Sequence, residues 1–357
     1  MYDLILAFIT AFIPCYILIP SIIHLAKAKH LYDMPDGKRK THTEIIPALG
    51  GIAIFVGIVF SVIFWTPFNV LAELQYMLAA FIVIFLIGVK DDILPMSARK
   101  KLIGELMAAG ILVYKGGISI NSLYGFFGIQ EIPAFVSIPL TIFTIIVIIN
   151  AFNLIDGING LSGSISLIIS VVLGSWYFLM DKSSFAILAF ALAGAVTAFL
   201  KYNFTPAQIF MGDTGALLLG LISAILVIKF MEINRLHPDN LYAIKAAPAI
   251  AVSIIIFPLF DTARVFAMRI WRGRSPFSAD RLHIHHLLLD YGFSHLQATS
   301  ILAIATLVFI TLAFWLQQIG TFQLLSVILI AAFLSSLFLQ KIVERKKQQL
   351  LALNGKN

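Results

Sequence analysis

Long runs of apolar residues, separated by short polar segments, make up most of this chain. An α-helix crosses the roughly 30 Å hydrocarbon layer of a bilayer in about 20 residues, which is the length of these runs. The pattern therefore predicts an all-α polytopic membrane protein with about eleven transmembrane helices. We place the spans at residues 4–26, 47–66, 73–90, 99–115, 134–151, 161–180, 184–200, 213–231, 244–270, 297–317 and 322–340.

The composition agrees with this prediction. Hydrophobic residues make up 60% of the chain, only 12% of residues are charged, and the mean hydropathy is +0.97. A soluble core could not bury that much apolar surface. The single cysteine, Cys15, rules out a disulfide framework and a cysteine metal site. No small-residue cleavage site follows the first apolar run, so we expect that run to be retained as a span rather than removed as a signal peptide.

Basic residues predict the orientation. They cluster at Lys27–Lys40, Lys90–Lys101, Arg264–Arg281 and Lys341–Lys356. Placing the N-terminus outside puts most of the 25 Lys and Arg on the inner side, as the positive-inside rule requires, and leaves the C-terminus in the cytoplasm.

In this topology the polar loops all lie on the cytoplasmic side of one membrane domain, residues 1–357. The loops are 27–46, 90–101, 152–160, 201–213 and 271–296. On the outer side, glycine pairs flank short β-like runs, which predicts a small β-hairpin near 116–133.

The adjacent carboxylates Asp91 and Asp92 follow an apolar run at the predicted mouth of a span. Ionised carboxylates are expensive near hydrocarbon, and two in a row repel each other unless a cation is near. A basic cluster that ends at Lys101 follows about ten residues later, so the loop has the groups to bind a metal-diphosphate. A helix end followed by a Pro turn and positive-inside lysines is the structural alternative.

Two further loops combine hard oxygen ligands with glycine. The segment 150–160 contains Asn153, Asp156 and Asn159 between apolar runs, and the glycines there let a backbone approach a ligand closely. In the segment 210–215, Asp213 lies between two glycines at the start of a span, where it could cap the helix or hold a metal or phosphate. Turn formation is the alternative for the first loop and capping alone for the second.

Histidine clusters in the last polar loop at His283, His285 and His286, just after Arg281. No further ligand stands at convincing spacing for a transition metal, and histidines beside arginines favour anion binding, either of a substrate phosphate or of lipid headgroups. Asp261 and Arg264, one helical turn apart, are expected to form a structural pair.

Taken in order along the chain, these motifs resemble the polyprenyl-phosphate N-acetylhexosamine-1-phosphate transferases, in particular their WecA/TagO-like bacterial branch within glycosyltransferase family 4. The resemblance covers nearly the whole chain. It is carried by five segments: Arg39–His42 with Pro47 and Gly50-Gly51, Asp91-Asp92, Asn153–Gly160, Met211–Gly215 and Ser275–His286.

The resemblance implies transfer of an N-acetylhexosamine 1-phosphate, GlcNAc-1-phosphate being favoured, from a UDP-sugar to undecaprenyl phosphate. The products are the undecaprenyl-diphosphate sugar and UMP, and the reaction is the first membrane step of a cell-surface polysaccharide such as O-antigen or teichoic acid. The expected setting is the bacterial inner (plasma) membrane, with the active site on the cytoplasmic face. The expected partners are the UDP-sugar, undecaprenyl phosphate, membrane lipids and a second copy in a homodimer, with no nucleic acid.

The resemblance also assigns roles to residues. Mg²⁺, or Mn²⁺ in its place, would be held by Asp213 with Asn153, and Asp91 and Asp92 would deprotonate or position the lipid phosphate. The remaining assignments are Lys101 and Arg281 for the diphosphate, Asp156 and Asn159 for the uridine, and His283, His285, His286 and His42 for the rest of the substrate. The chain departs from the DDxxD run of some relatives, since Pro95 stands at its fifth position.

Two rival functions are weighed against this one. A phospho-N-acetylmuramoyl-pentapeptide transferase is the alternative within the same enzyme class, and the run Pro276–Arg281 before the histidines favours the small-sugar branch. A secondary transporter would place charges at the bilayer midplane and broken helices in both halves, whereas the carboxylates here gather at one predicted face.

Overall fold

The computed structural model describes residues 2–29, 31, 46–126, 128–275 and 280–354. The chain divides into two compact units, Met1–Ile244 and Lys245–Asn357. The first contains α1 (Tyr2–Ala28), α2 (Gly50–Trp65), α3 (Phe68–Ile93), α4 (Ala98–Tyr114), β1 (Ser122–Phe126), β2 (Ile129–Glu131), α5 (Ala134–Ile155), α6 (Leu161–Leu179), α7 (Ser183–Asn203) and α8 (Gly212–Leu236). The second contains α9 (Ala247–Ile254), α10 (Ile256–Trp271), α11 (Ile284–Tyr291), α12 (His295–Leu316), a 3-10 turn η1 (Gln317–Ile319) and α13 (Thr321–Asn354).

The helical, multi-pass character predicted from the hydropathy pattern is confirmed. Within the described residues, seven helices are long and apolar enough to cross a membrane, and a bent pair raises the number to eight. The apolar helix α2 is shorter than these, with 16 residues. The number of eleven spans and the outside-to-inside orientation stay predictions.

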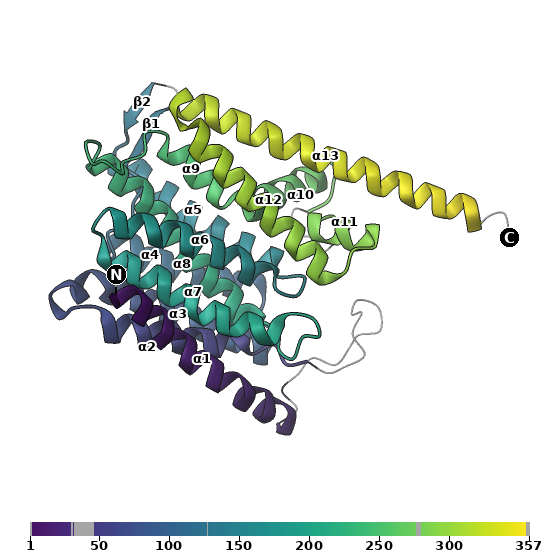
Figure 1. The fold of residues 1–357 in the computed structure, drawn as a ribbon, viewed down its shortest axis with the longest axis horizontal. Coiled ribbons are helices and arrows are strands. Elements are labelled where there is room, and N and C mark those ends of the chain that lie inside the picture. Colours follow the sequence, from purple (N-terminus) through teal and green to yellow (C-terminus); the bar gives the residue numbers. More distant parts are fainter. Residues whose placement is uncertain (1, 30, 32–45, 127, 276–279, 355–357) are drawn as a thin grey trace. The chain divides into compact units, whose positions relative to one another are not determined.

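The two central helices of the first unit are α7 and α8. Most of each helix is buried, α7 packs against α1, α2 and α6, and α8 packs against α2, α3, α5 and α6 (Figure 1). Both helices are apolar on all sides, as expected for helices surrounded by other helices. By contrast, α1 leaves large aliphatic side chains such as Ile9, Ile13 and Ile17 exposed, as a lipid-facing helix would.

The predicted hairpin is present. Strands β1 and β2 pair antiparallel, with Ser122 opposite Glu131 and Phe126 opposite Ile129. Near its base, Arg235 at the end of α8 forms ion pairs with Glu131 (3.0 Å) and Glu232 (2.6 Å), so the hairpin is tied to that helix end.

The predicted ninth span is not one straight helix. Residues 247–271 form α9 and α10, which meet at Ile255 with a bend of 78°. Pro258 lies in the first turn of α10 and has no backbone N–H to donate to Ile254, so the hydrogen-bond ladder is interrupted at this point. The remaining helices of the second unit pack around this pair, with α9 against α12 and α13 and α11 also against α12 and α13.

Candidate active site

The first turn of α8 is held by a carboxylate from another helix. Asp92, at the end of α3, accepts hydrogen bonds from the backbone N–H groups of Asp213 (2.6 Å) and Thr214 (3.0 Å) and from the Thr214 hydroxyl (2.5 Å). These N–H groups have no partner within their own helix. Asp92 therefore supplies the cap, and Asp213, which the sequence suggested as a capping residue, keeps its side chain for other contacts.

Glycine makes this close approach of α3 and α8 feasible. A Cβ on Gly88, one turn before Asp92, would lie 2.3 Å from the Cα of Thr214. Gly212 has a φ of +73°, which favours glycine, and a Cβ there would lie 2.7 Å from both carboxylate oxygens of Asp92. The predicted Gly50-Gly51 motif supports the same loop, because its N–H groups donate to Phe210 and Met211 (both 2.9 Å).

Lys101 lies at the centre of a polar cluster formed by α3, α4, α5 and α8. Its ammonium is 2.9 Å from Asp213 Oδ1 and 3.3 Å from Asp91 Oδ2. With the amide of Asn153 oriented to suit its neighbours, that side chain donates to Asp213 Oδ1 (2.6 Å) and accepts from Lys101 (3.2 Å). The other oxygen of Asp91 accepts from the backbone N–H of Met96 (2.6 Å), which fixes this carboxylate toward Lys101.

The charge of this cluster is not balanced. Asp91 and Asp213 share one lysine, so the two carboxylates, when ionised, leave an excess of negative charge, and Asp92 lies beside the backbone of Asp213. Carboxylate and amide oxygens are the ligands that Mg²⁺ prefers, and Mg²⁺ uses only one or two carboxylates before it turns to water and phosphate. Asp213 and Asn153 fit that donor set. In the described part of the chain, no three His, Cys, Asp or Glu side chains gather as a complete metal site.

The loop after α5 brings Asp156 and Asn159 close to the same helix ends. Asp156 accepts a hydrogen bond from Ser162 (2.5 Å), and Asn159 is buried and donates to the Thr205 hydroxyl (3.2 Å). Burial, with a further contribution from the charges of Asp213 and Asp92, raises the pKa of Asp156 to about 7 even though the Ser162 bond opposes the shift. Asp156 is thus a carboxyl group that changes charge near neutral pH.

Glu105, which was not among the residues predicted from the sequence, belongs to this neighbourhood. It lies one turn beyond Lys101 on α4, is almost completely buried, and accepts a hydrogen bond from Asn150 of α5 (2.6 Å). Asn150 in turn lies one turn before Asn153. The sequence does contain a signal for these contacts. Lys101 and Glu105 are four residues apart and the two asparagines are three apart, so each pair lies on one face of its helix.

The histidine segment lies in the second unit, and a buried carboxylate organises it. Asp261 of α10 accepts from His283 Nδ1 (2.8 Å), from the backbone N–H of Ile284 (3.0 Å) and from Arg264 Nη2 (2.9 Å). The expected pairing of Asp261 with Arg264 is confirmed. The pair is not isolated, because Asp261 also contacts His283, the first of the three histidines.

The other two histidines have ring nitrogens without hydrogen-bond partners. Both ring nitrogens of His285 and Nδ1 of His286 are buried and unpaired, and the two rings lie 4.2 Å apart between centroids. Burial, reinforced by the neighbouring charge of His286, lowers the pKa of His285 to about 3, so its ring is neutral at physiological pH. Burial likewise lowers the pKa of His286, with Arg281 adding to the effect.

The arginines of this segment differ in exposure. Arg281 is exposed and lies 3.3 Å from Asp290, so its guanidinium is accessible to a ligand. Arg269 is buried and bonds both oxygens of Asp280 (2.8 and 2.9 Å), which fixes the chain just before the histidines. Hydrogen bonds from Arg269 lower the pKa of Asp280. His42, the remaining predicted contact, lies outside the described residues.

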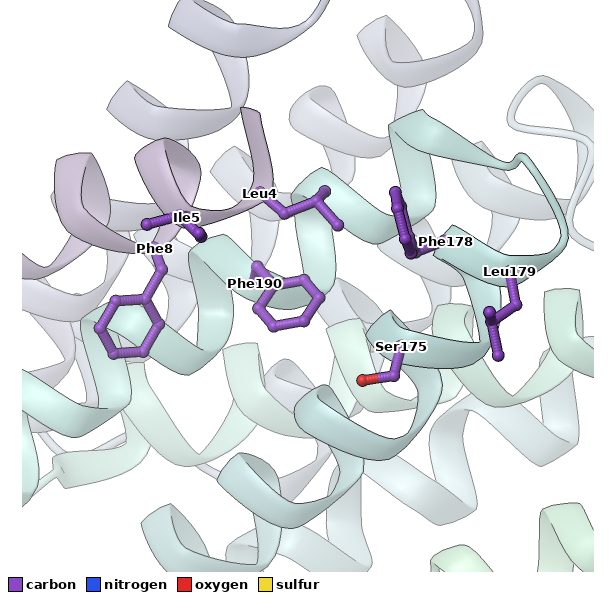
Figure 2. Close-up of a pocket in the computed structure, with 7 residues that line it drawn as sticks. All are labelled: Leu4, Ile5, Phe8, Ser175, Phe178, Leu179 and Phe190. Carbon is purple, nitrogen blue, oxygen red and sulfur yellow. The ribbon is translucent and has the colours of Figure 1, made fainter. Parts of the chain in front are cut away.

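A pocket of about 470 Å³ opens elsewhere, at the start of α1 beside α6 and α7 (Figure 2). Its lining is apolar except for one hydroxyl, and it consists of Leu4, Ile5, Phe8, Ser175, Phe178, Leu179 and Phe190. This lining holds no charged side chain and only one hydroxyl, that of Ser175, so the candidate active site is the polar cluster around Lys101.

Comparison with known proteins points to one family. The model of glycosyl transferase family 4 matches residues 74–231, a range that includes the whole Lys101 cluster. A protein of Bacillus subtilis named "probable undecaprenyl-phosphate N-acetylglucosaminyl 1-phosphate transferase" is 31% identical over 352 residues, which is 96% of this chain and 92% of the relative.

Two further relatives come from other bacterial groups. The undecaprenyl-phosphate alpha-N-acetylglucosaminyl 1-phosphate transferase of Escherichia coli O157:H7 is 30% identical over 79% of this chain and 75% of its own length. The decaprenyl-phosphate N-acetylglucosaminephosphotransferase of Mycolicibacterium smegmatis is 30% identical over 73% of this chain and 69% of its own length.

Proposed function

The chain belongs to glycosyl transferase family 4, and on that premise we propose that it transfers GlcNAc-1-phosphate from UDP-GlcNAc to undecaprenyl phosphate. An oxygen of the lipid phosphate attacks the phosphorus that carries the sugar, the bond to the other phosphate breaks, and UMP leaves. The names of the B. subtilis and E. coli relatives support this lipid and this sugar, and they favour it over the muramoyl-pentapeptide alternative.

The observation that carries the proposal is the position of Lys101 between Asp91 and Asp213. The cluster combines one lysine with a surplus of carboxylate, and a diphosphate with its metal ion supplies the complementary charges. A transporter pathway would have no need of a lysine paired with two carboxylates and an amide at the end of a capped helix.

Mg²⁺, or Mn²⁺ in its place, would be held by Asp213 and Asn153, whose oxygens meet its preference for hard ligands. When bound, the ion would neutralise charge on the phosphoryl group that is transferred. Lys101 would add a second positive charge at the diphosphate, because its ammonium is already held beside the same carboxylate.

The two adjacent aspartates have different roles in this proposal. The second pKa of a phosphate monoester is about 6, so the attacking lipid phosphate is largely ionised at pH 7 and needs no strong base. Asp91 would position it through Lys101. Both oxygens of Asp92 accept hydrogen bonds from the first turn of α8, so its contribution would be to hold Asp213 in place.

The other predicted contacts are part of the proposal too. Asp156 and Asn159 would bind the uridine, and Arg281, His283, His285 and His286 would contact the phosphate and sugar of the donor. The accessible guanidinium of Arg281 and the unpaired ring nitrogens of His285 support a ligand-binding role for that segment. We further propose that the protein lies in the bacterial plasma membrane with this chemistry on the cytoplasmic side, and that it forms a homodimer.

The test is purified protein with undecaprenyl phosphate, Mg²⁺ and a panel of UDP-sugars, scored for UMP. UDP-GlcNAc should release the most UMP, and release should stop when the metal is chelated. Folded protein that releases no UMP with any sugar would refute the proposal. Uptake of a solute into sealed vesicles by such protein would support the transporter instead.

The metal ligand is tested by Asp213→Asn, with the exposed Asp239→Asn as a matched carboxylate-to-amide control. Asp213→Asn should lose more than 100-fold of turnover, since removing one preorganised charge of this kind costs about 3 kcal/mol or more. Mn²⁺ binding, followed by electron paramagnetic resonance, should weaken in the same variant and not in the control. Full activity of Asp213→Asn would rule out the ligand role.

A further inference from the structure

Asp261 is the most completely buried carboxylate in the described part of the second unit, and two of its three hydrogen-bond partners, His283 and Ile284, belong to the histidine segment. Its side chain has no exposed surface. One oxygen accepts from Arg264 Nη2 and from the backbone N–H of Ile284, and the other faces Nδ1 of His283 at 2.8 Å. A buried ionised carboxylate is stable only when it is paired and hydrogen-bonded in this way.

The contact between Asp261 and His283 decides which ring nitrogen carries the proton. An ionised carboxylate only accepts hydrogen bonds, so Nδ1 must be the donor. A neutral ring that donates from Nδ1 has an unprotonated Nε2, which is a hydrogen-bond acceptor.

The same carboxylate also places the ring. The bond from Ile284 N to Asp261 fixes the first turn of α11, which begins one residue after His283. At the other end of α11, Lys346 of α13 donates to the carbonyl oxygen of Tyr291 and lies over its ring, 4.2 Å from the centroid. The helix that carries His285 and His286 is thus held at both ends by buried or half-buried charged side chains.

We propose that Asp261 is a positioning residue of the transferase, which holds His283 as the Nδ1–H tautomer so that Nε2 accepts a hydrogen bond from the sugar of the donor. This inference rests on the proposed function. Phosphate oxygens of the ionised diphosphate are acceptors and cannot donate to Nε2, whereas the hydroxyl groups and the amide N–H of an N-acetylhexosamine can. His283 therefore contacts the sugar, and the phosphates are left to the cationic side chains.

The first test is the tautomer itself, measured by ¹⁵N NMR of histidine-labelled protein above pH 8. The ring signals of His283 are identified by their loss in His283→Gln. Wild-type protein should show protonated Nδ1 and unprotonated Nε2 at this residue. Protonated Nε2 in the wild type would overturn the inference, and this measurement needs no variant of Asp261 and no activity.

The second test is Asp261→Asn, with the exposed Glu344→Gln as the control. The new amide can donate to Nδ1, so the proton should move to Nε2. The KM for UDP-GlcNAc should rise about tenfold, the equivalent of one lost hydrogen bond of about 1.4 kcal/mol. The KM for undecaprenyl phosphate should not change. A moved proton with an unchanged KM for the sugar nucleotide would overturn the positioning role.

The third test separates positioning from general stability. If Asp261 acts through His283, then Asp261→Asn combined with His283→Gln should be no worse than His283→Gln alone. Losses that multiply would show that Asp261 acts by another route and would overturn the inference. Wild-type protein that makes no UMP but shows the expected tautomer would refute the proposed function and leave the tautomer assignment supported.

Discussion

Replacing Asp92 tests whether this residue caps α8. Asp92→Ala removes an acceptor for two backbone N–H groups and one hydroxyl at the start of that helix. Loss of an N-terminal cap costs about 0.5–2 kcal/mol, and a hydrogen bond to a charged group is worth about 1.5–3 kcal/mol. Because the three bonds share one carboxylate and water replaces part of them, we expect a loss of about 3 kcal/mol.

This loss should be visible as a lower melting temperature. For a domain of this size, 1 kcal/mol corresponds to about 2–4 °C, so the midpoint should fall by roughly 6–12 °C. Asp92→Asn keeps one carbonyl oxygen as an acceptor and should lose about half as much. The assay is thermal unfolding in detergent without divalent metal, followed by tryptophan fluorescence.

The site of the damage is measured by amide hydrogen exchange. Exchange should accelerate at residues 213–216 in Asp92→Ala, because this is the turn that loses its cap. Asp239→Ala, an exposed aspartate in the same unit, is the control and should melt with the wild type. If Asp92→Ala also melts within 2 °C of the wild type, roughly 1 kcal/mol or less, the capping role is wrong.

Three further predictions concern other charged groups. Glu105→Gln should keep the hydrogen bond from Asn150 and the wild-type melting temperature. Glu105→Leu leaves that amide unpaired and should lower the free energy of unfolding by about 1–3 kcal/mol. Equal stability of the two variants would contradict this prediction. Lys346→Gln should weaken the end of α11 by about 1 kcal/mol, seen as faster amide exchange near Tyr291, and unchanged exchange would count against the contact. Because the pKa of His285 is lowered, this residue binds a proton below about pH 6.5 in the unfolded chain but not in the folded protein. The free energy of unfolding should therefore fall as the pH drops from 6.5 toward 3, by roughly 2 kcal/mol at pH 5. His285→Gln should flatten this part of the melting curve against pH, and a curve with the wild-type slope would refute the assignment.

Residues near one another in the chain were the easiest to interpret. The helical membrane character follows from hydropathy, the hairpin from glycine and β-like runs, and the Asp261–Arg264 pair from helical spacing. Each of these depends on interactions within a few residues, whose geometry is the same in any protein. The same reasoning failed at residue 255, because a single proline does not reveal how far a helix will bend.

Contacts between distant segments were not predictable in this way. Asp92 and Asp213 were both predicted to be functional carboxylates, but their different contacts depend on the distance between α3 and α8, which Gly88 permits. Glu105 was not predicted to have a role, and it is the buried partner of Asn150. Hydrophobic patterning fixes which face of a helix is buried, but not which helix will cover it.

Hydropathy and residue type were enough to predict a helical membrane protein with clustered carboxylates, amides and histidines in polar loops, because both are local properties. The contacts of each group depend on the tertiary structure. In the folded chain, Lys101 lies between Asp91 and Asp213, and Asp92 accepts hydrogen bonds at the start of α8. Asp261 contacts His283, which is 22 residues away in the sequence. Hydrogen bonds and ion pairs act over about 3 Å, so they depend on the packing of whole helices, and no spacing along the chain reports that distance.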